Sequence, residues 1–378
     1  MRAKIMLRNL FHRRLPAIPF TYGVPVPEGA AKTGSDLALL DGKGAPVPLS
    51  VQSMATWPDK SIRWALLDFQ GDFGPNENTA WQLAIGEGTK TPLPAHPVTV
   101  QEKDGEIVVD NGCLHMTFRA AQFSLFHSLT TDGVDIIRPG SRCDIVAVSP
   151  AGKIFRASLD PNPRLSVEDK TPLRTVIRWD GGLFAGDGAR LTEFRVKIHV
   201  FAGNPYLKIE HSVINRETPE RGVHLREYRI ELDTTLDQRT EKIVRQKTHG
   251  VDNFSRLAAL RQNVTLLVPT EGQNPPGMPA GATGIFGIAG KCLIEDESAF
   301  QEDFGSFPHF LKPDAPRVML GGGYAIVYPF MGVRDKTKTA VVSFLRMCPQ
   351  HPKAMRADEN RITFDVWPAG AGQWRLCR

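Results

Sequence analysis

Apolar and polar residues alternate through the stretch Thr192–Val200, and this period constrains the fold more than any other feature of the 378-residue chain. Successive side chains of an extended strand point to opposite faces. One face of this stretch therefore carries apolar residues, and the other carries Glu193, Arg195, Lys197 and His199. Similar runs follow at Leu207–Val213 and His224–Tyr228, after turn-forming segments. We predict an antiparallel meander with one face packed on a second sheet and the other face wet.

Glycine and proline divide the rest of the chain into short segments of the same kind. The 34 glycines and 29 prolines are spread throughout, which is typical of an all-β protein. Only Phe254–Gln262 and His351–Ala357 suggest a couple of helical turns. Hydrophobic and charged contents of 41% and 23% fit a globular protein, and the length allows two domains. We predict an all-β chain with a small N-terminal barrel or sandwich and a larger antiparallel β-sandwich.

The formal net charge of +5 is accounted for by five basic residues that precede the first acidic residue, Glu28: Arg2, Lys4, Arg8, Arg13 and Arg14. We interpret residues 1–14 as a basic leader. A nucleic-acid partner is not expected, because it requires a basic folded surface. No membrane partner is expected either, since no run of about 18 apolar residues occurs. The N-terminus lacks a signal-peptide core, and five scattered cysteines without a CxxC pair favour a reducing, cytoplasmic location.

Two motifs near the N-terminus carry a family resemblance: YGVPVPEG at Tyr22–Gly29 and WPDKSIRWALLDF at Trp57–Phe69. In this order they resemble the RIFT barrel of the exo-rhamnogalacturonan lyase, or YetA-like, family, whose usual pattern is GVPxPxG followed by WPDGSxKW. Lys60 stands where the pattern has glycine, so it must adopt the backbone conformation that glycine adopts there in the family. Segments from Glu106 onward resemble the family's central β-sandwich. The resemblance implies a RIFT-barrel-like domain at 15–92 and a sandwich at 98–378.

The same resemblance implies an activity. Members of the family remove units from rhamnogalacturonan-like, uronate-containing chains of pectin by β-elimination, so the expected partner is a uronate-containing oligo- or polysaccharide. In the family a C-terminal (α/α) toroid follows the sandwich, whereas this sequence stops at Arg378. We expect a truncated lyase, a lyase completed by a separate helical-toroid chain, or a two-domain protein with another role. With one wall of the cleft missing, the chain alone is expected to bind sugar weakly and turn nothing over.

β-Elimination needs a cation on the uronate carboxylate, a base and an acid. His224, Arg226 and Tyr228 are spaced i, i+2 and i+4, and we predict that they share one strand face as the catalytic group. Arg226 would bind the carboxylate through its bidentate fork, and His224 or Tyr228 would serve as base or acid. The alternative is that all three are ordinary cross-strand pairs.

The expected substrate-binding residues come from the wet face and from the segment Arg346–Met355, which resembles a family motif: Lys208, Arg195, His199, Gln350 and Lys353. A solvated face and a turn that closes the sandwich are the alternatives. His211 falls on the apolar side and is predicted to be a core histidine. Trp57 and Trp64 could stack on a sugar, although core packing is the favoured interpretation.

No cofactor is predicted, and no cluster has the spacing of metal ligands, although scattered carboxylates could still bind calcium. Three other functions remain open. A non-catalytic carbohydrate-binding or accessory protein predicts sugar binding without unsaturated products. A mutarotase- or epimerase-like enzyme predicts anomer interconversion without bond cleavage. A structural assembly protein predicts a stable oligomer without sugar affinity.

Overall fold

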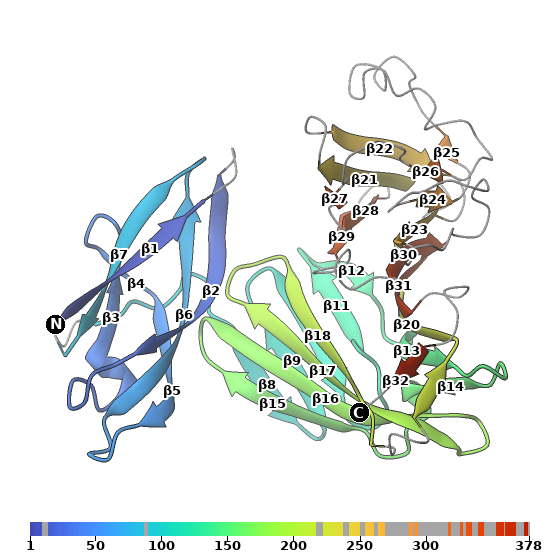
Figure 1. Ribbon diagram of the computed structural model, residues 1–378, viewed down its shortest axis with the longest axis horizontal. Helices are drawn as coiled ribbons and strands as arrows, with labels where there is room; N and C mark the ends of the chain where they lie inside the picture. The colour runs from blue at the N-terminus through green and yellow to red at the C-terminus, as the bar shows by residue number, and fades with distance from the viewer. Residues whose placement is uncertain are drawn as a thin grey trace.

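The protein is built almost entirely of β-strands, as the computed structural model shows (Figure 1). The structure describes residues 1–9, 14–86, 90–216, 222–236 and 360–367 in full. Between residues 242 and 358, and again at 374–376, it describes the backbone of the strands. Its helical turns within the described residues are two short 3-10 segments, η1 (Gly34–Asp36) and η2 (Ala157–Leu159). The prediction of an all-β barrel followed by a β-sandwich is confirmed.

Two sheets form the N-terminal barrel. One has the order β1 (Arg2–Arg8), β7 (Asn78–Ile85), β3 (Leu37–Leu40) and β4 (Pro46–Val47). The other has the order β2 (Leu15–Pro25), β6 (Ile62–Phe73) and β5 (Leu49–Thr56). Their inner faces enclose one apolar core, because side chains alternate across each strand.

Strand β1 corrects the expectation of a basic leader at residues 1–14. It pairs with β7 along its whole length, from Arg2 opposite Ala84 to Arg8 opposite Asn78. Ile5 and Leu7 pack against the barrel core, while the basic residues Arg2, Lys4 and Arg8 of the same strand stay exposed. The leader interpretation is therefore wrong for residues 2–8, because an alternating strand pattern underlies the basic residues.

The two family-like motifs bind each other in the folded barrel. The indole Nε1 of Trp57 donates to the carbonyl of Val26 at 2.8 Å, and the amide of Val26 donates to the carbonyl of Arg63 at 3.0 Å. Lys60 has a φ of +70°, the left-handed conformation expected where the family pattern has glycine.

The sandwich packs a small sheet on a large one, and both contribute to a single core. The small sheet runs β12 (Val134–Ile137), β11 (Ser128–Thr131), β10 (Leu114–Arg119), β9 (Glu106–Asp110) and β8 (Thr99–Lys103). The large sheet begins β18 (Leu207–Ile214), β17 (Arg190–Phe201), β16 (Arg174–Phe184), β14 (Ile154–Arg156), β13 (Cys143–Val148), β20 (Glu227–Asp233) and β31 (Arg361–Trp367). It continues through β30 (Lys353–Asp358), β23 (Val264–Val268), β24 (Gly287–Ala289) and β26 (Arg317–Val318), while β15 (Arg164–Lys170) pairs with β16.

The predicted meander is correct for its first two strands and wrong for the third. β17 pairs with β18 and buries every second side chain, as the alternation predicts. The third run is broken into β19 (Val223–Leu225), which pairs with β32 (Trp374–Leu376), and β20, which lies between β13 and β31. Most residues of β20 are buried, which fits its central position in the sheet. β18, by contrast, is an edge strand without a buried residue.

Both segments that suggested helical turns contain strands instead. Phe254–Leu260 forms β22, which pairs with β21 (Lys242–His249), and Lys353–Asp358 forms β30. Pairing with neighbouring strands overrides the weak local preference. The remaining strands are β25 (Cys292–Leu293), β27 (Ile326–Val327), β28 (Phe330–Arg334) and β29 (Thr339–Ser343). In the described part of the chain, no helix has the length and apolarity to cross a bilayer.

Candidate functional site

The outward face of β15–β18 is the wet face predicted from the alternation, and its charges are paired with one another. Asp180 accepts hydrogen bonds from Arg178 at 2.5 Å and from Arg195 at 2.7 Å. Lys208 lies 2.6 Å from Glu210. Because cations and carboxylates alternate on this face, it has little excess charge to attract a polyuronate. Arg195 and Lys208, both expected to bind substrate, are thus already engaged within the chain.

Burial and hydrogen bonding change the pKa of Asp180 in opposite directions. Its partial burial raises the pKa, but the hydrogen bonds and charges of Arg178 and Arg195 outweigh that effect and hold the pKa below its usual value. The carboxylate therefore stays ionised at neutral pH and binds β16 to β17.

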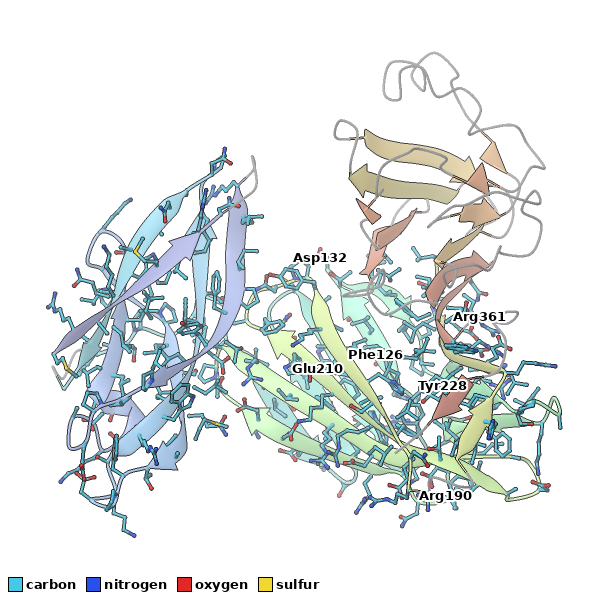
Figure 2. The ribbon with its side chains drawn as sticks, in the orientation of Figure 1. Phe126, Asp132, Arg190, Glu210, Tyr228 and Arg361 are labelled. Atoms are coloured by element: carbon cyan, nitrogen blue, oxygen red, sulfur yellow. The ribbon has the colours of Figure 1, made fainter. Side chains whose placement is uncertain are left out.

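His199 lies at the end of this face that is closer to the barrel, where Figure 2 also places Glu210. The Nη1 group of Arg174 lies 3.3 Å from its Nδ1. Arginine can only donate, so Nδ1 accepts and the ring proton sits on Nε2. Nε2 is 3.5 Å from a carboxylate oxygen of Glu210, too far for a formed hydrogen bond, and no other described residue is its partner.

The same arginine connects His199 to the barrel. Nε of Arg174 donates to Asp68 of β6 at 3.0 Å, and Nη2 donates to Asp169 of β15 at 2.5 Å. Burial is the main cause that lowers the pKa of His199, and Arg174 and Lys208 add to it, so the ring is neutral at pH 7. His199 is therefore part of a buried junction between the domains.

The predicted catalytic triplet does not share a face. His224 in β19 and Arg226 in the bend after it are exposed, whereas Tyr228 in β20 is fully buried. The bend is fixed by the amide of Arg226, which donates to the carbonyl of Val148 at 2.7 Å. The alternation of buried and exposed side chains is interrupted here, because the successive residues Glu227 and Tyr228 are both buried. The pairing with β31 is also irregular just after Tyr228. The expectation that all three point to one side is wrong for this reason.

Tyr228 is paired instead with His211, on a strand far from it in the sheet. Its hydroxyl lies 2.9 Å from Nε2 of His211, and the ring centroids are 5.3 Å apart. Burial raises the pKa of Tyr228 well above its usual value, so the hydroxyl keeps its proton at neutral pH. His211 lies opposite Val196 on the core side of β18, which confirms that it faces the apolar layer, although it is only half-buried.

Among the predicted site residues whose side chains are described, His224 and Arg226 are without a partner in the described part of the chain. Within the described residues, neither side chain forms a hydrogen bond or ion pair. Gln350 lies outside the described residues, and only the backbone of Lys353, at the start of β30, is described. No group of three or more His, Cys, Asp and Glu side chains in the described ranges could hold a metal ion.

A second charged cluster covers the outer side of β13, β20 and β31, where Figure 2 labels Arg361. Glu231 accepts from Arg229 at 2.7 Å, and Asp233 accepts from Arg361 at 2.5 Å. Asp144 accepts from Ser158 at 2.7 Å, while burial raises the pKa of Asp144. Since its carboxylates are already matched by arginines and a hydroxyl, we assign this cluster to holding the central strands together.

Sequence reasoning did not identify His211, Arg174 or Asp68 as members of a site. Their partners are distant in the chain: Asp68 and Arg174 are 106 residues apart, and His211 and Tyr228 lie on strands that do not pair. No local pattern signals such contacts. Trp64 was expected in the core, yet 44% of it is exposed.

Two domain families match the chain, in the same order as the folded domains. Residues 3–82 match the PcRGLX-like N-terminal RIFT barrel domain, and residues 98–240 match the PcRGLX-like protein central beta sandwich domain. A curated relative, the uncharacterized protein YetA of Bacillus subtilis (strain 168), is 26% identical over 169 residues. That alignment covers 43% of this chain and 19% of YetA, so the chain spans about a fifth of the relative's length.

Proposed function

Because the chain belongs to the PcRGLX-like, or YetA-like, family through its barrel and sandwich domains, we propose that it acts on uronate-containing polysaccharides of the rhamnogalacturonan type by β-elimination. One observation carries this proposal. The exposed guanidinium of Arg226 has no hydrogen-bond or ion-pair partner among the described residues, and it lies two residues before Tyr228, which holds His211 through a hydrogen bond. A carboxylate-binding group and a histidine fixed by tyrosine are the parts that the reaction requires.

The roles follow from exposure. Arg226 binds the uronate carboxylate and thereby makes the neighbouring C–H more acidic. His224, which no described residue engages, is the exposed imidazole that can accept that proton. Tyr228 is buried and cannot touch a substrate in this arrangement, so it acts as a positioning residue. It fixes the ring of His211, and we assign to this half-buried imidazole the return of a proton to the leaving oxygen.

The test is to incubate the full chain with rhamnogalacturonan oligosaccharides and record the ultraviolet absorbance of unsaturated products. Arg226→Ala is expected to lower the rate about 100- to 1,000-fold, because one charge-stabilising donor is lost. Arg138→Ala is the matched control: this exposed arginine pairs with Asp135 at 3.1 Å and should leave the rate unchanged. An equal effect of both substitutions would contradict the proposal.

Tyr228→Phe tests the positioning role separately. Removing the hydroxyl frees Nε2 of His211, so the pH at which product formation is half-maximal should shift. The free energy of unfolding is measured alongside and should fall by about 1–2 kcal/mol for the lost buried hydrogen bond. A loss of stability with an unchanged pH profile would show that the pair is purely structural.

A non-catalytic carbohydrate-binding role is the second candidate. It is favoured by the paired charges of the β15–β18 face and by the exposed ring of Trp64. Because the alignment spans about a fifth of YetA, the complete relative's activity need not reside in these two domains. Binding of the oligosaccharide without any unsaturated product would support this second function.

A further inference from the structure

A small set of polar contacts joins the barrel to the sandwich, which lie side by side in Figure 1. Gln70 and Asn204 each contribute a neutral hydrogen bond to a backbone carbonyl of the other domain. The charged contact is the buried pair of Asp68 and Arg174, and the same arginine contacts His199. Because each domain has its own apolar core, their relative placement depends on these polar groups.

The ring of His199 can take up a second proton at one atom only. Nη1 of Arg174 donates to Nδ1 at 3.3 Å, so the neutral ring carries its proton on Nε2. A second proton must therefore go to Nδ1. Two N–H donors would then face each other, and both groups would be positively charged. The ring and the guanidinium cannot keep their contact once His199 is protonated.

The other charged groups around the ring do not replace the contact that protonation breaks. They come from every strand packed against His199: Arg174 of β16, Asp169 of β15, Lys208 and Glu210 of β18, Asp68 of the barrel strand β6, and Lys197 of β17 itself. Glu210 faces Nε2 at 3.5 Å, but this carboxylate is 45% exposed and lies 2.6 Å from Lys208. Asp68 and Asp169 are both bonded to Arg174. Each of these carboxylates is thus already paired with a cation.

The charge state of His199 sets the direction of the pH dependence. Burial lowers its pKa; the charge of Glu210 opposes this, while Lys208 and Arg174 add to it, so the pKa stays below its ordinary value. When Arg174 moves away, the ring gains solvent and its pKa returns towards about 6.5. The separated form then binds a proton more readily, so the joined form loses stability as pH falls below about 6.5.

Of the two carboxylates bound by Arg174, Asp68 is the one that it loses. Asp169 accepts from Nη2 at 2.5 Å and lies on β15, which pairs with β16 and therefore moves with Arg174. Asp68 accepts from Nε at 3.0 Å and belongs to the other domain. A guanidinium that turns away from His199 keeps its partner in the same sheet and gives up its partner in the barrel.

We propose that His199 and Arg174 form a proton-sensitive junction that releases the barrel from the sandwich in mild acid. Protonation of Nδ1 ends the contact with Arg174, and Arg174 then loses Asp68. The two neutral hydrogen bonds that remain are too weak to hold the domains together. The proton comes from solvent and leaves again when the pH rises, so the separation is reversible. This inference concerns the arrangement of the domains and does not depend on the proposed lyase chemistry.

The experiment is small-angle X-ray scattering of the full chain, without ligand, at pH 7 and pH 5. The radius of gyration of the wild type should rise by about 2 Å or more at pH 5, because two compact domains move apart. Its circular dichroism should stay the same, since each domain keeps its own core. His199→Gln should have the same radius at both pH values, because a carboxamide oxygen accepts from Arg174 and cannot be protonated. His115→Gln is the matched control: this histidine is 50% exposed beside Asp110 and should respond like the wild type.

Two charge variants test the titrating group separately from the fold. Lys208→Gln removes a cation near the ring, so separation should occur at a higher pH than in the wild type. Glu210→Gln removes the facing carboxylate and should shift the midpoint to a lower pH. Both side chains are nearly half exposed, so both variants should fold. A histidine with a purely structural role would not produce shifts of opposite sign.

Equal wild-type radii at pH 7 and pH 5 would overturn the inference, and so would an increase that persists in His199→Gln. Loss of circular dichroism together with the larger radius would also overturn it, because the chain would then be unfolding. If His199→Gln does not fold, the shifts of the two charge variants decide, and a midpoint unmoved in both overturns the inference. No substrate is present, so failure here leaves the ultraviolet assay of the lyase function unaffected.

Discussion

At the scale of single residues, the backbone of Lys60 shows how a family pattern encodes geometry. The turn from Trp57 to Ser61 closes through the amide of Lys60, which donates to the carbonyl of Trp57 at 3.0 Å. This places Lys60 at a φ of +70°, where the Cβ atom is crowded and glycine is preferred. The exposed side chain makes no described contact that would offset the cost.

Lys60→Gly is expected to raise the free energy of unfolding by about 0.5–1 kcal/mol, because relief of crowding exceeds the added freedom of the unfolded chain. Urea denaturation measures the change. Lys43→Gly is the matched control: this turn lysine has no positive φ, so glycine should lower stability by about 0.5 kcal/mol. A destabilised Lys60→Gly would mean that crowding does not govern this turn.

At the scale of secondary structure, charged side chains join the strands of the wet face. Asp180 of β16 binds Arg178 on its own strand and Arg195 on β17, and Lys197 of β17 reaches Glu168 of β15 at 2.8 Å. β18 is the edge of the sheet, and none of its residues is buried. Charged side chains along such an edge protect it from pairing with other chains.

Asp180→Asn is expected to lower the free energy of unfolding at pH 7. The folded-state pKa of Asp180 is depressed, so its contribution is fully present above the unfolded value of about 3.9 and is lost as pH falls through the folded value. Urea denaturation at pH 7 and pH 3 should show the difference from wild type shrinking at the lower pH. Asp135→Asn, at an exposed ion pair, should change little at either pH. A difference that does not depend on pH would contradict this account.

At the scale of the whole molecule, the barrel and the sandwich have separate apolar cores, and the two domains contact each other through a few polar groups. The buried pair of Asp68 and Arg174 is central to them, and Gln70 adds a hydrogen bond to the carbonyl of Ala202 at 2.8 Å. Asn204 donates to the carbonyl of Ala17 at 3.1 Å. Because these groups are desolvated, each depends on its partner more than a surface pair would.

Asp68→Ala should destabilise the protein by about 3 kcal/mol, since it leaves the buried guanidinium of Arg174 without its barrel partner. Combining it with Arg174→Met should cost clearly less than the sum of the two single changes, which calorimetric unfolding can measure. Gln70→Ala, which removes one neutral hydrogen bond, should cost about 1 kcal/mol. If the losses of unfolding free energy of the two single variants add up to that of the double variant, Asp68 and Arg174 do not couple the domains.

Local sequence determined the elements that depend on backbone geometry alone. The period of two in Thr192–Val200 fixes the faces of β17, because side chains of any extended strand must alternate. The glycine position of the WPD motif fixes the left-handed turn at Lys60, because sterics of the Cβ atom restrict φ. The barrel and sandwich followed from such patterns, repeated along the chain.

Only the tertiary structure decided which side chains meet. The two successive buried residues Glu227 and Tyr228 lie opposite β13, and the register with β31 shifts just after Tyr228, so this break in the alternation belongs to the assembled sheet. The pairing of Tyr228 with His211, and of Arg174 with Asp68, depends on how distant strands are placed. Burial and ion pairing are properties of the assembled sheets, so the sequence could predict a charged face but could not predict that its charges cancel.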